Sequence, residues 1–295
     1  MMNTHTTRRL FLCAAGAAPL LAQTDSLPTI EELFRRTVGD RSRSNIPFPA
    51  HKVINNIYYI GTESFASFLI TTPEGHILVN TCFERQVPIL QDQTAKLGFD
   101  FSDIKVIVGS HAHGDHMEGD ALAKELTGAQ VMAMAEDVPA LRRMMPGGKP
   151  HPIDRILNDG DEVMLGGTTL VARLTPGHSR GCTTWTMKAE EGGKTYDVVI
   201  VGSVGVNPGF KLVNNPDAPQ IAEEYMRSFE VLRALPCDIP LASHPQMYNL
   251  AEKYPRLGKG PNPFIDPAGY RAEIDLREKV FLRELEAQKK AAGLV

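Results

Sequence analysis

The sequence lacks three features that would each indicate a particular class of protein. It contains no apolar run of about 18 residues, so nothing in it predicts a membrane-spanning helix. Its 31 Lys and Arg against 35 Asp and Glu give a formal charge of -4, which argues against a nucleic-acid partner. It has no low-complexity tract and no long linker. Its 295 residues, 42% of them hydrophobic, therefore predict one globular domain after an N-terminal extension.

The N-terminal extension has the layout of an export signal. In "TTRRLFLCAAGAAPLLAQ", Arg8 and Arg9 precede a short Ala-rich apolar segment, the order expected of a secretory signal. The arginine pair resembles a twin-arginine export signal. The alternative is that the N-terminal extension is a frayed helix. We expect residues 1–22 to be removed near Ala22, a periplasmic location, and a single domain over residues 23–295.

Cysteine is scarce. Removal of the signal would take Cys13 and leave Cys82, Cys182 and Cys237. In an oxidising compartment these allow one disulfide and one spare thiol, and the sequence leaves the pairing open. The alternative is three buried thiols that pack as small hydrophobic side chains.

The hydrophobic pattern predicts two groups of strands with helices between them. Residues 53–60, 65–72 and 77–80 predict an antiparallel meander with a turn at Pro73 and Gly75. Asp266 is a good N-cap, with Pro267 at the first position of a terminal helix. Further strands are expected at 105–110, 129–134, 162–165, 168–174, 182–188, 196–202 and 238–243, and helices at 84–97, 115–126, 136–144 and 216–235, with a loop at 145–152. This order suggests two sheets with helices outside.

Histidine is concentrated in "HAHGDH", residues 111–116, directly after a predicted buried strand. An extended chain points His111 and His113 to the same side, and His116 follows Asp115 where a helix should begin. Neutral imidazoles and a carboxylate are ligands that zinc prefers, so this cluster predicts a metal site.

Two further histidines, His178 and His244, lie in loops directly after predicted strands, where a rigid scaffold can position a site. The other four lie in the signal, in turns or in Gly/Pro-rich segments. We interpret these four as solvated polar residues: His5, His51, His76 and His151.

Five blocks together resemble the metallo-β-lactamase superfamily, and within it the class B β-lactamases of subclass B3. The likeness covers about residues 50–290. The blocks are "HAHGDH" (111–116), "TPGHSRGCTTW" (175–185), "GSVGVNPGFKLVNNP" (202–216), "RALPCDIPLASHP" (233–245) and "FIDPAGYRAEID" (264–275). The resemblance implies an α/β fold, an αββα four-layer sandwich of two mixed β-sheets flanked by helices, with a two-zinc site at one edge.

The resemblance also implies which residues bind two Zn²⁺ ions per chain. The first zinc would be bound by His111, His113 and His178, and the second by Asp115, His116 and His244. Asp115 would in addition orient a zinc-bound hydroxide. Three protein ligands per metal leave coordination positions open, which is the pattern of a catalytic site.

The implied activity is that of a periplasmic zinc β-lactamase, a monomer that opens the β-lactam amide of penicillins, cephalosporins and carbapenems and so confers antibiotic resistance. Ser203 and Asn207 stand where contacts to the substrate carboxylate are expected. The alternative is that both residues serve only the backbone turn in which they lie. By the same resemblance, Met144, Met145 and His151 belong to a loop that would border the substrate groove.

Many hydrolases of the superfamily place an Asp that bridges both metals at the strand end where Ser203 or Val204 stands here. Its absence favours a β-lactamase over a lactonase or thioesterase, which remains the alternative, and a non-catalytic zinc-binding module is the third hypothesis.

Cys182, four residues after His178, is either a packing residue or a soft group near zinc. Some relatives pair a cysteine at the position of Cys237 with one near the terminal helix, where Tyr270 stands here, so we expect no such bridge.

Overall fold

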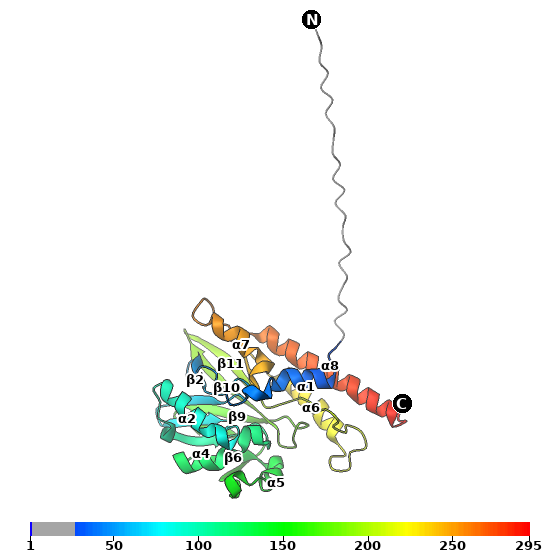
Figure 1. Ribbon diagram of the computed structural model, residues 1–295, viewed down its shortest axis with the longest axis horizontal. Helices are drawn as coiled ribbons and strands as arrows, with labels where there is room; N and C mark the ends of the chain where they lie inside the picture. The colour runs from blue at the N-terminus through cyan, green and yellow to red at the C-terminus, as the bar shows by residue number, and fades with distance from the viewer. Residues whose placement is uncertain (2–26) are drawn as a thin grey trace.

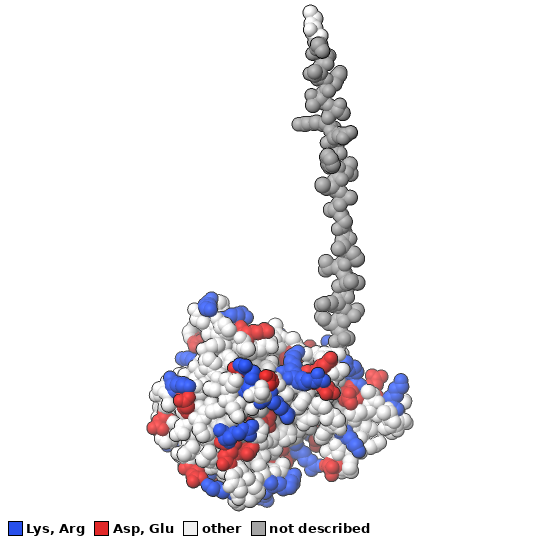
Figure 2. All heavy atoms as spheres, viewed as in Figure 1, with Lys and Arg blue, Asp and Glu red and all other residues white. Residues whose placement is uncertain are grey.

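A computed structural model describes Met1 and residues 27–295, and Figure 1 draws residues 2–26 as a thin grey trace. The predicted export signal, with His5 and Cys13, therefore lies outside the described residues apart from Met1. Within the described part of the chain, no helix combines the length and apolarity that a membrane crossing needs. Positive and negative side chains are interspersed over the face shown in Figure 2.

The first half of the chain forms a mixed seven-stranded sheet in which spatial order follows chain order. The first four strands are antiparallel and the last four run parallel, because helices connect them. The strands are β1 (His51–Ile54), β2 (Ile57–Tyr59), β3 (Phe68–Thr72), β4 (Gly75–Val79), β5 (Ile104–Val108), β6 (Gln130–Met134) and β7 (Arg155–Leu157).

The second half forms a five-stranded sheet in the order β12-β11-β10-β9-β8. Four strands are antiparallel, and the last pairs in parallel with its neighbour after a helical crossover. These strands are β8 (Glu162–Leu165), β9 (Thr168–Leu174), β10 (Thr183–Glu191), β11 (Lys194–Val201) and β12 (Ile239–Ala242).

Helices cover the outer face of each sheet (Figure 1). The α-helices are α1 (Ile30–Val38), α2 (Val87–Lys96), α3 (Gly114–Met117), α4 (Asp120–Thr127), α5 (Val138–Leu141), α6 (Ile221–Ala234), α7 (Leu250–Lys253) and α8 (Pro267–Ala291). The short 3-10 helices are η1 (Arg41–Arg43), η2 (Glu84–Gln86), η3 (Phe101–Asp103), η4 (Ala135–Asp137), η5 (Pro146–Gly148), η6 (Pro245–Tyr248) and η7 (Tyr254–Arg256).

The core follows from side-chain alternation along the strands. On β3, Phe68 and Ile70 point into the core between the sheets, whereas Leu69 points outward to the cluster under α2 and α4. On the far side, α8 packs on β12 and α6, and its stripe includes Ile274 and Phe281. The layers are therefore helix, sheet, sheet and helix, which confirms the expected αββα sandwich of two mixed sheets.

Several expected element bounds were wrong, because local geometry interrupts the pattern. The single strand expected at 53–60 is a hairpin: Asn55, with a φ of 44°, turns the chain between β1 and β2. The helix expected at 115–126 is split at Gly119, where a Cβ would lie 2.8 Å from the Thr81 carbonyl oxygen. The strand at 65–72 begins only at Phe68, and the helix at 216–235 begins at Ile221.

β7, α1, α7 and several 3-10 helices had no counterpart among our predictions, and one expected loop is partly helical. β7 is short and forms an edge of its sheet, and η5 lies within the predicted loop 145–152. α1 begins with a capping box in which the Thr29 hydroxyl accepts the Glu32 N–H at 3.1 Å and the Glu32 carboxylate accepts the Thr29 N–H at 2.7 Å.

The interpretation of His51, His76 and His151 as solvated residues was wrong, because all three are buried. His51 is stacked against Tyr59 with ring centroids 5.5 Å apart, and His76 meets Phe99 edge-on. His151 Nε2 lies 3.2 Å from Asp120 Oδ2 and 3.1 Å from the Met117 carbonyl oxygen. Turn-like local sequence gave no sign of these partners.

Candidate metal centre

Six candidate ligands converge from three loops at one edge of the two sheets. The segment 111–116 follows β5 of the seven-stranded sheet. His178 follows β9 and His244 follows β12, both in the five-stranded sheet. Strand β10 of one sheet is joined to the start of the 111–116 segment: the Trp185 indole donates to the Gly109 carbonyl oxygen at 3.0 Å, and the Thr183 N–H donates to the Ser110 carbonyl oxygen at 2.7 Å. The site is therefore built on strand ends of both halves of the fold.

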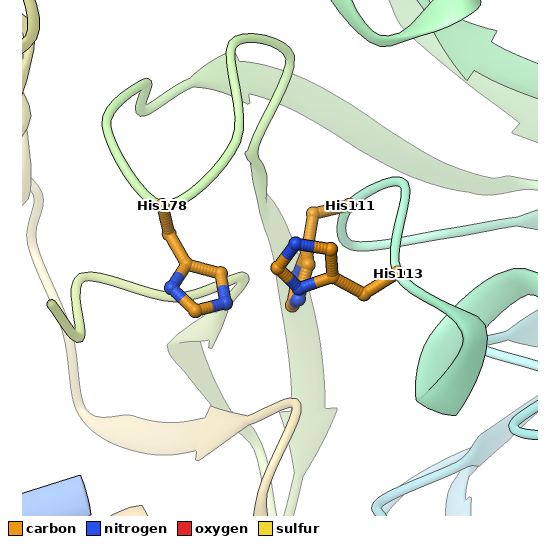
Figure 3. Close-up of side chains that lie close together, drawn as sticks. All are labelled: His111, His113 and His178. Carbon is orange, nitrogen blue, oxygen red and sulfur yellow. The ribbon is translucent and has the colours of Figure 1, made fainter. Parts of the chain in front are cut away.

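The first triad consists of His111, His113 and His178. Their ring centroids lie 4.7, 4.6 and 4.8 Å apart in pairs, and one ligand atom from each lies within 4.8 Å of the others. Figure 3 shows the three rings converging, with His178 on one loop and His111 and His113 on another. This spacing suits three nitrogen ligands around one ion.

The second triad consists of Asp115, His116 and His244, whose ligand atoms also lie within 4.8 Å of one another. Asp115 Oδ2 is 3.4 Å from His116 Nε2 and 3.8 Å from His244 Nε2. The rings of His111 and His116 are 4.2 Å apart, so the two triads adjoin. All six residues expected to bind metal are brought together in the predicted two groups.

Hydrogen bonds to the remaining ring nitrogens orient the imidazoles. His178 Nδ1 lies 2.6 Å from the Gly205 carbonyl oxygen, and His244 Nδ1 lies 3.0 Å from the Ser64 carbonyl oxygen. A carbonyl oxygen can only accept, so each Nδ1 carries the proton and each Nε2 presents its lone pair to the site. Carbonyl acceptors of this kind are typical partners of metal-binding histidines.

The donor set fits metal ions. Among the described residues 27–295, His111 Nε2 and both ring nitrogens of His116 are buried and make no hydrogen bond. Buried polar atoms without partners are costly, so their convergence beside a carboxylate calls for a cation. Imidazole nitrogens and one carboxylate are ligands of zinc in tetrahedral sites.

Burial and crowding set the charge of these groups. Burial, reinforced by the neighbouring imidazoles, lowers the pKa of His178 to about 3 and that of His244 to about 4. The pKa of His111 is held well below its usual value for the same reasons. Burial alone would raise the pKa of Asp115, but His116 and His244 outweigh it and hold that pKa far below its usual range. At neutral pH His111, His178 and His244 are therefore neutral imidazoles beside the Asp115 carboxylate.

The two residues expected to contact substrate lie beside these triads. Ser203 and Asn207 line a small cavity together with His178 and His244, and α1 closes its far wall. The Ser203 hydroxyl oxygen accepts the Gly205 N–H at 3.3 Å, which leaves its own proton free to donate.

The cysteines take no part in either triad. Cys82, Cys182 and Cys237 are free thiols. Cys182 is buried and its thiol donates to the Ser203 carbonyl oxygen at 3.3 Å, so of its two interpretations the packing role holds. Burial raises the pKa of the Cys182 thiol, which keeps it neutral. Tyr270 lies beside Cys237 and donates its hydroxyl to the Leu232 carbonyl oxygen at 2.7 Å.

Sequence reasoning missed two polar residues that support the histidine loops. Asn80, directly after β4, accepts the Ser110 N–H at 2.8 Å through its side chain. Asp137, after β6, accepts the Ala112 N–H at 2.8 Å. Each follows a buried strand and belongs to no motif. A polar residue at a strand end was the available signal, but it is too common to single them out.

Comparison with known proteins agrees with this geometry. The metallo-beta-lactamase superfamily model matches residues 64–244, more than half of the chain. The native FEZ-1 metallo-beta-lactamase from Legionella gormanii is 46% identical over 83% of this chain and 98% of its own, with a TM-score of 0.80. BJP-1, a subclass B3 metallo-beta-lactamase of Bradyrhizobium japonicum, is 35% identical over 85% of this chain and 98% of its own, with a TM-score of 0.78.

Curated relatives match over shorter stretches. The hydroxyacylglutathione hydrolase of Methylococcus capsulatus is 30% identical over 132 residues, which are 45% of this chain and 44% of that protein. The chain thus spans less than half the length of the curated relatives that it matches. With the two triads at the sheet edge and a likeness to subclass B3 enzymes along nearly their whole length, the chain belongs to the metallo-beta-lactamase superfamily.

Proposed function

We propose that this protein is a zinc-dependent β-lactamase that hydrolyses the amide bond of penicillins, cephalosporins and carbapenems, and so confers antibiotic resistance. One observation carries the proposal. Two adjoining triads of candidate ligands contain a single carboxylate, Asp115, and the uncharged Ser203 lies beside them where a bridging Asp stands in many other hydrolases of the superfamily.

In the proposed assignment, His111, His113 and His178 hold the first zinc, and Asp115, His116 and His244 hold the second. When bound, two zinc ions would activate a water molecule for attack on the β-lactam carbonyl and stabilise the charge that develops on its oxygen. Asp115 supplies the negative charge of the site and would orient the attacking water. The neutral imidazoles of His111, His178 and His244 supply lone pairs without first losing a proton.

Ser203 and Asn207 are proposed to bind the substrate carboxylate. The Ser203 hydroxyl is buried beside His244 and keeps a free proton, so it donates to an anion that enters the site. Asn207 is half-buried, and its side chain makes no hydrogen bond to another described residue. Its amide is thus available as a second donor. Two such donors fix which face of the lactam ring meets the metal site.

A lactone or thioester hydrolase is the second candidate. The likeness to hydroxyacylglutathione hydrolase supports it, since the same metal chemistry serves either substrate and a fold does not determine the substrate. A zinc-binding module without activity is the third candidate, and the open ligand sets argue against it.

The test compares substrate classes on one preparation of the protein lacking residues 1–22. We expect a penicillin, a chromogenic cephalosporin and a carbapenem to be hydrolysed, with activity lost on chelation and regained with zinc. A lactone or thioester hydrolysed far faster than every β-lactam would establish the second candidate and contradict the first.

We also propose that the protein is exported to the periplasm. Arg8 and Arg9 followed by an apolar segment support this. Cell fractionation should find the wild type in the periplasm, whereas a variant with both arginines changed to lysine should remain in the cytoplasm. Equal periplasmic amounts of both forms would rule out the twin-arginine route.

A further inference from the structure

Asp137 is a buried carboxylate that belongs to neither histidine loop. It ends η4, directly after β6, and only 3% of it is exposed. Three donors surround it. Its Oδ2 accepts the Ala112 N–H at 2.8 Å and the Ser179 hydroxyl at 2.8 Å, and its Oδ1 accepts the Gly181 N–H at 2.7 Å.

The three donors come from both loops that carry the first triad. Ala112 lies between His111 and His113, and Ser179 directly follows His178. The two loops follow strands of different sheets, β5 and β9. One backbone hydrogen bond, from the Thr183 N–H to the Ser110 carbonyl oxygen at 2.7 Å, joins the sheets just before His111. Asp137 adds contacts closer to the ligands, at Ala112 between His111 and His113 and at Ser179 next to His178.

Gly181 shows how closely the carboxylate and the His178 loop approach. A Cβ at Gly181 would lie 2.5 Å from the backbone nitrogen of Asp137 and 2.7 Å from its Cγ. Neither atom is the mobile end of a long side chain, so a larger residue would force the loop away. Gly181 is needed here for space, since it is not among the glycines with a positive φ.

The second triad is held by different contacts. The His116 carbonyl oxygen accepts the N–H groups of Thr81 at 3.0 Å and Cys82 at 3.2 Å. His244 is held through its ring by the Ser64 carbonyl oxygen. None of these contacts involves Asp137, although the His116 N–H donates to the His113 carbonyl oxygen at 3.1 Å within the shared segment 111–116. A change at Asp137 should therefore bear on the first triad more than on the second.

We propose that Asp137 is a positioning residue that fixes His111 and His113 against His178 and thereby sets the affinity of the first metal site. The inference rests on the proposed function, in which the first triad holds zinc. Partners that orient metal ligands typically contribute about 10-fold to 100-fold to metal affinity, and a shift of the ligands by a fraction of an ångström is enough to lose it.

The experiment measures zinc affinity by competition with a colorimetric zinc chelator in Asp137→Asn and Asp137→Ala. Both variants are also made in a His244→Ala background, which disables the second triad so that bound zinc reports on the first alone. We expect the first site to weaken by about 10-fold to 100-fold in Asp137→Ala and by less in Asp137→Asn, which keeps one acceptor oxygen. The second site should keep nearly its wild-type affinity.

Asp238→Asn is the matched control. Its carboxylate also accepts a backbone N–H, that of Asp197 at 2.8 Å, but at the end of β12 opposite His244. We expect wild-type zinc affinity there. If the Asp137 variants do not fold, Ser179→Ala removes one donor and should still weaken the first site selectively.

Two results would contradict this inference, and they differ in what they say about the proposed function. Folded Asp137→Ala, or Ser179→Ala in its place, with wild-type affinity at the first site would overturn this inference alone. A wild-type protein that binds no zinc would overturn the proposed function, and this inference with it.

Discussion

At the scale of single residues, the candidate site is a set of imidazoles around one carboxylate. Burial lowers the pKa of His111, and so do three imidazoles whose ring centroids lie 4.2–4.7 Å from its own. The spacing of residues 111–116 and the place of two other histidines after strands predicted a metal site, and the family resemblance implied how the six ligands would group. Their role as ligands stays a proposal.

The sequence was less informative where partners are distant along the chain. His151 and Asp120 are 31 residues apart, and Asp137 meets Gly181 44 residues away. Nothing in the local pattern around these residues differs from an ordinary loop or strand end. Such contacts depend on how two sheets pack, which local spacing does not encode.

Replacing Ser203 by alanine should weaken substrate binding more than it slows the chemical step. A hydrogen bond to a charged group contributes about 1.5–3 kcal/mol, so we expect KM to rise about tenfold or more with kcat little changed. Steady-state kinetics on a cephalosporin measures both. Ser102→Ala, at an exposed serine whose hydroxyl donates only to Asp100, is the control. An unchanged KM would show that Ser203 does not contact substrate.

At the scale of elements, long periodic segments were predicted best. α8 begins at the expected N-cap, where Asp266 accepts the Gly269 N–H at 2.9 Å. α1 was missed because its short amphipathic pattern was not recognised, although its capping box was present in the sequence. The hairpin at Asn55 was missed because apolar residues continue on both sides of the turn.

The stability of the helical layer on the five-stranded sheet should depend on Phe281. Its ring packs on Tyr225 at 5.2 Å and on Phe229 at 5.6 Å, and it is 1% exposed. Phe281→Ala should lower the free energy of unfolding by about 3–5 kcal/mol, measured by denaturant titration. Leu282→Ala, at the exposed neighbouring position, should change it by less than about 0.5 kcal/mol. Equal effects would contradict the packing assigned to α8.

At the scale of the whole molecule, two half-folds pack face to face over one core, and the site at their common edge exists only when both are in place. This couples the ionisation of the histidines to folding. The unfolded chain binds protons at these histidines near pH 6.5, whereas the folded chain takes them up at His244 only near pH 4 and at His178 near pH 3.

The metal-free protein should therefore lose stability on acidification. Between about pH 6.5 and pH 4 the unfolded state binds more protons, so the free energy of unfolding falls as the pH falls. Denaturant titrations of metal-free protein across this range measure the slope. The slope should be smaller in His178→Gln, which cannot take up the proton. A flat profile in the wild type would refute the depressed pKa values.

The most direct test of the central claim is a zinc titration of the metal-free protein with β-lactam hydrolysis followed in the same samples. The proposed site predicts no turnover without metal, rising activity as zinc is added, and a plateau at two zinc ions per chain. Two bound zinc ions per chain without hydrolysis of any penicillin, cephalosporin or carbapenem, or full hydrolysis by metal-free protein, would contradict it.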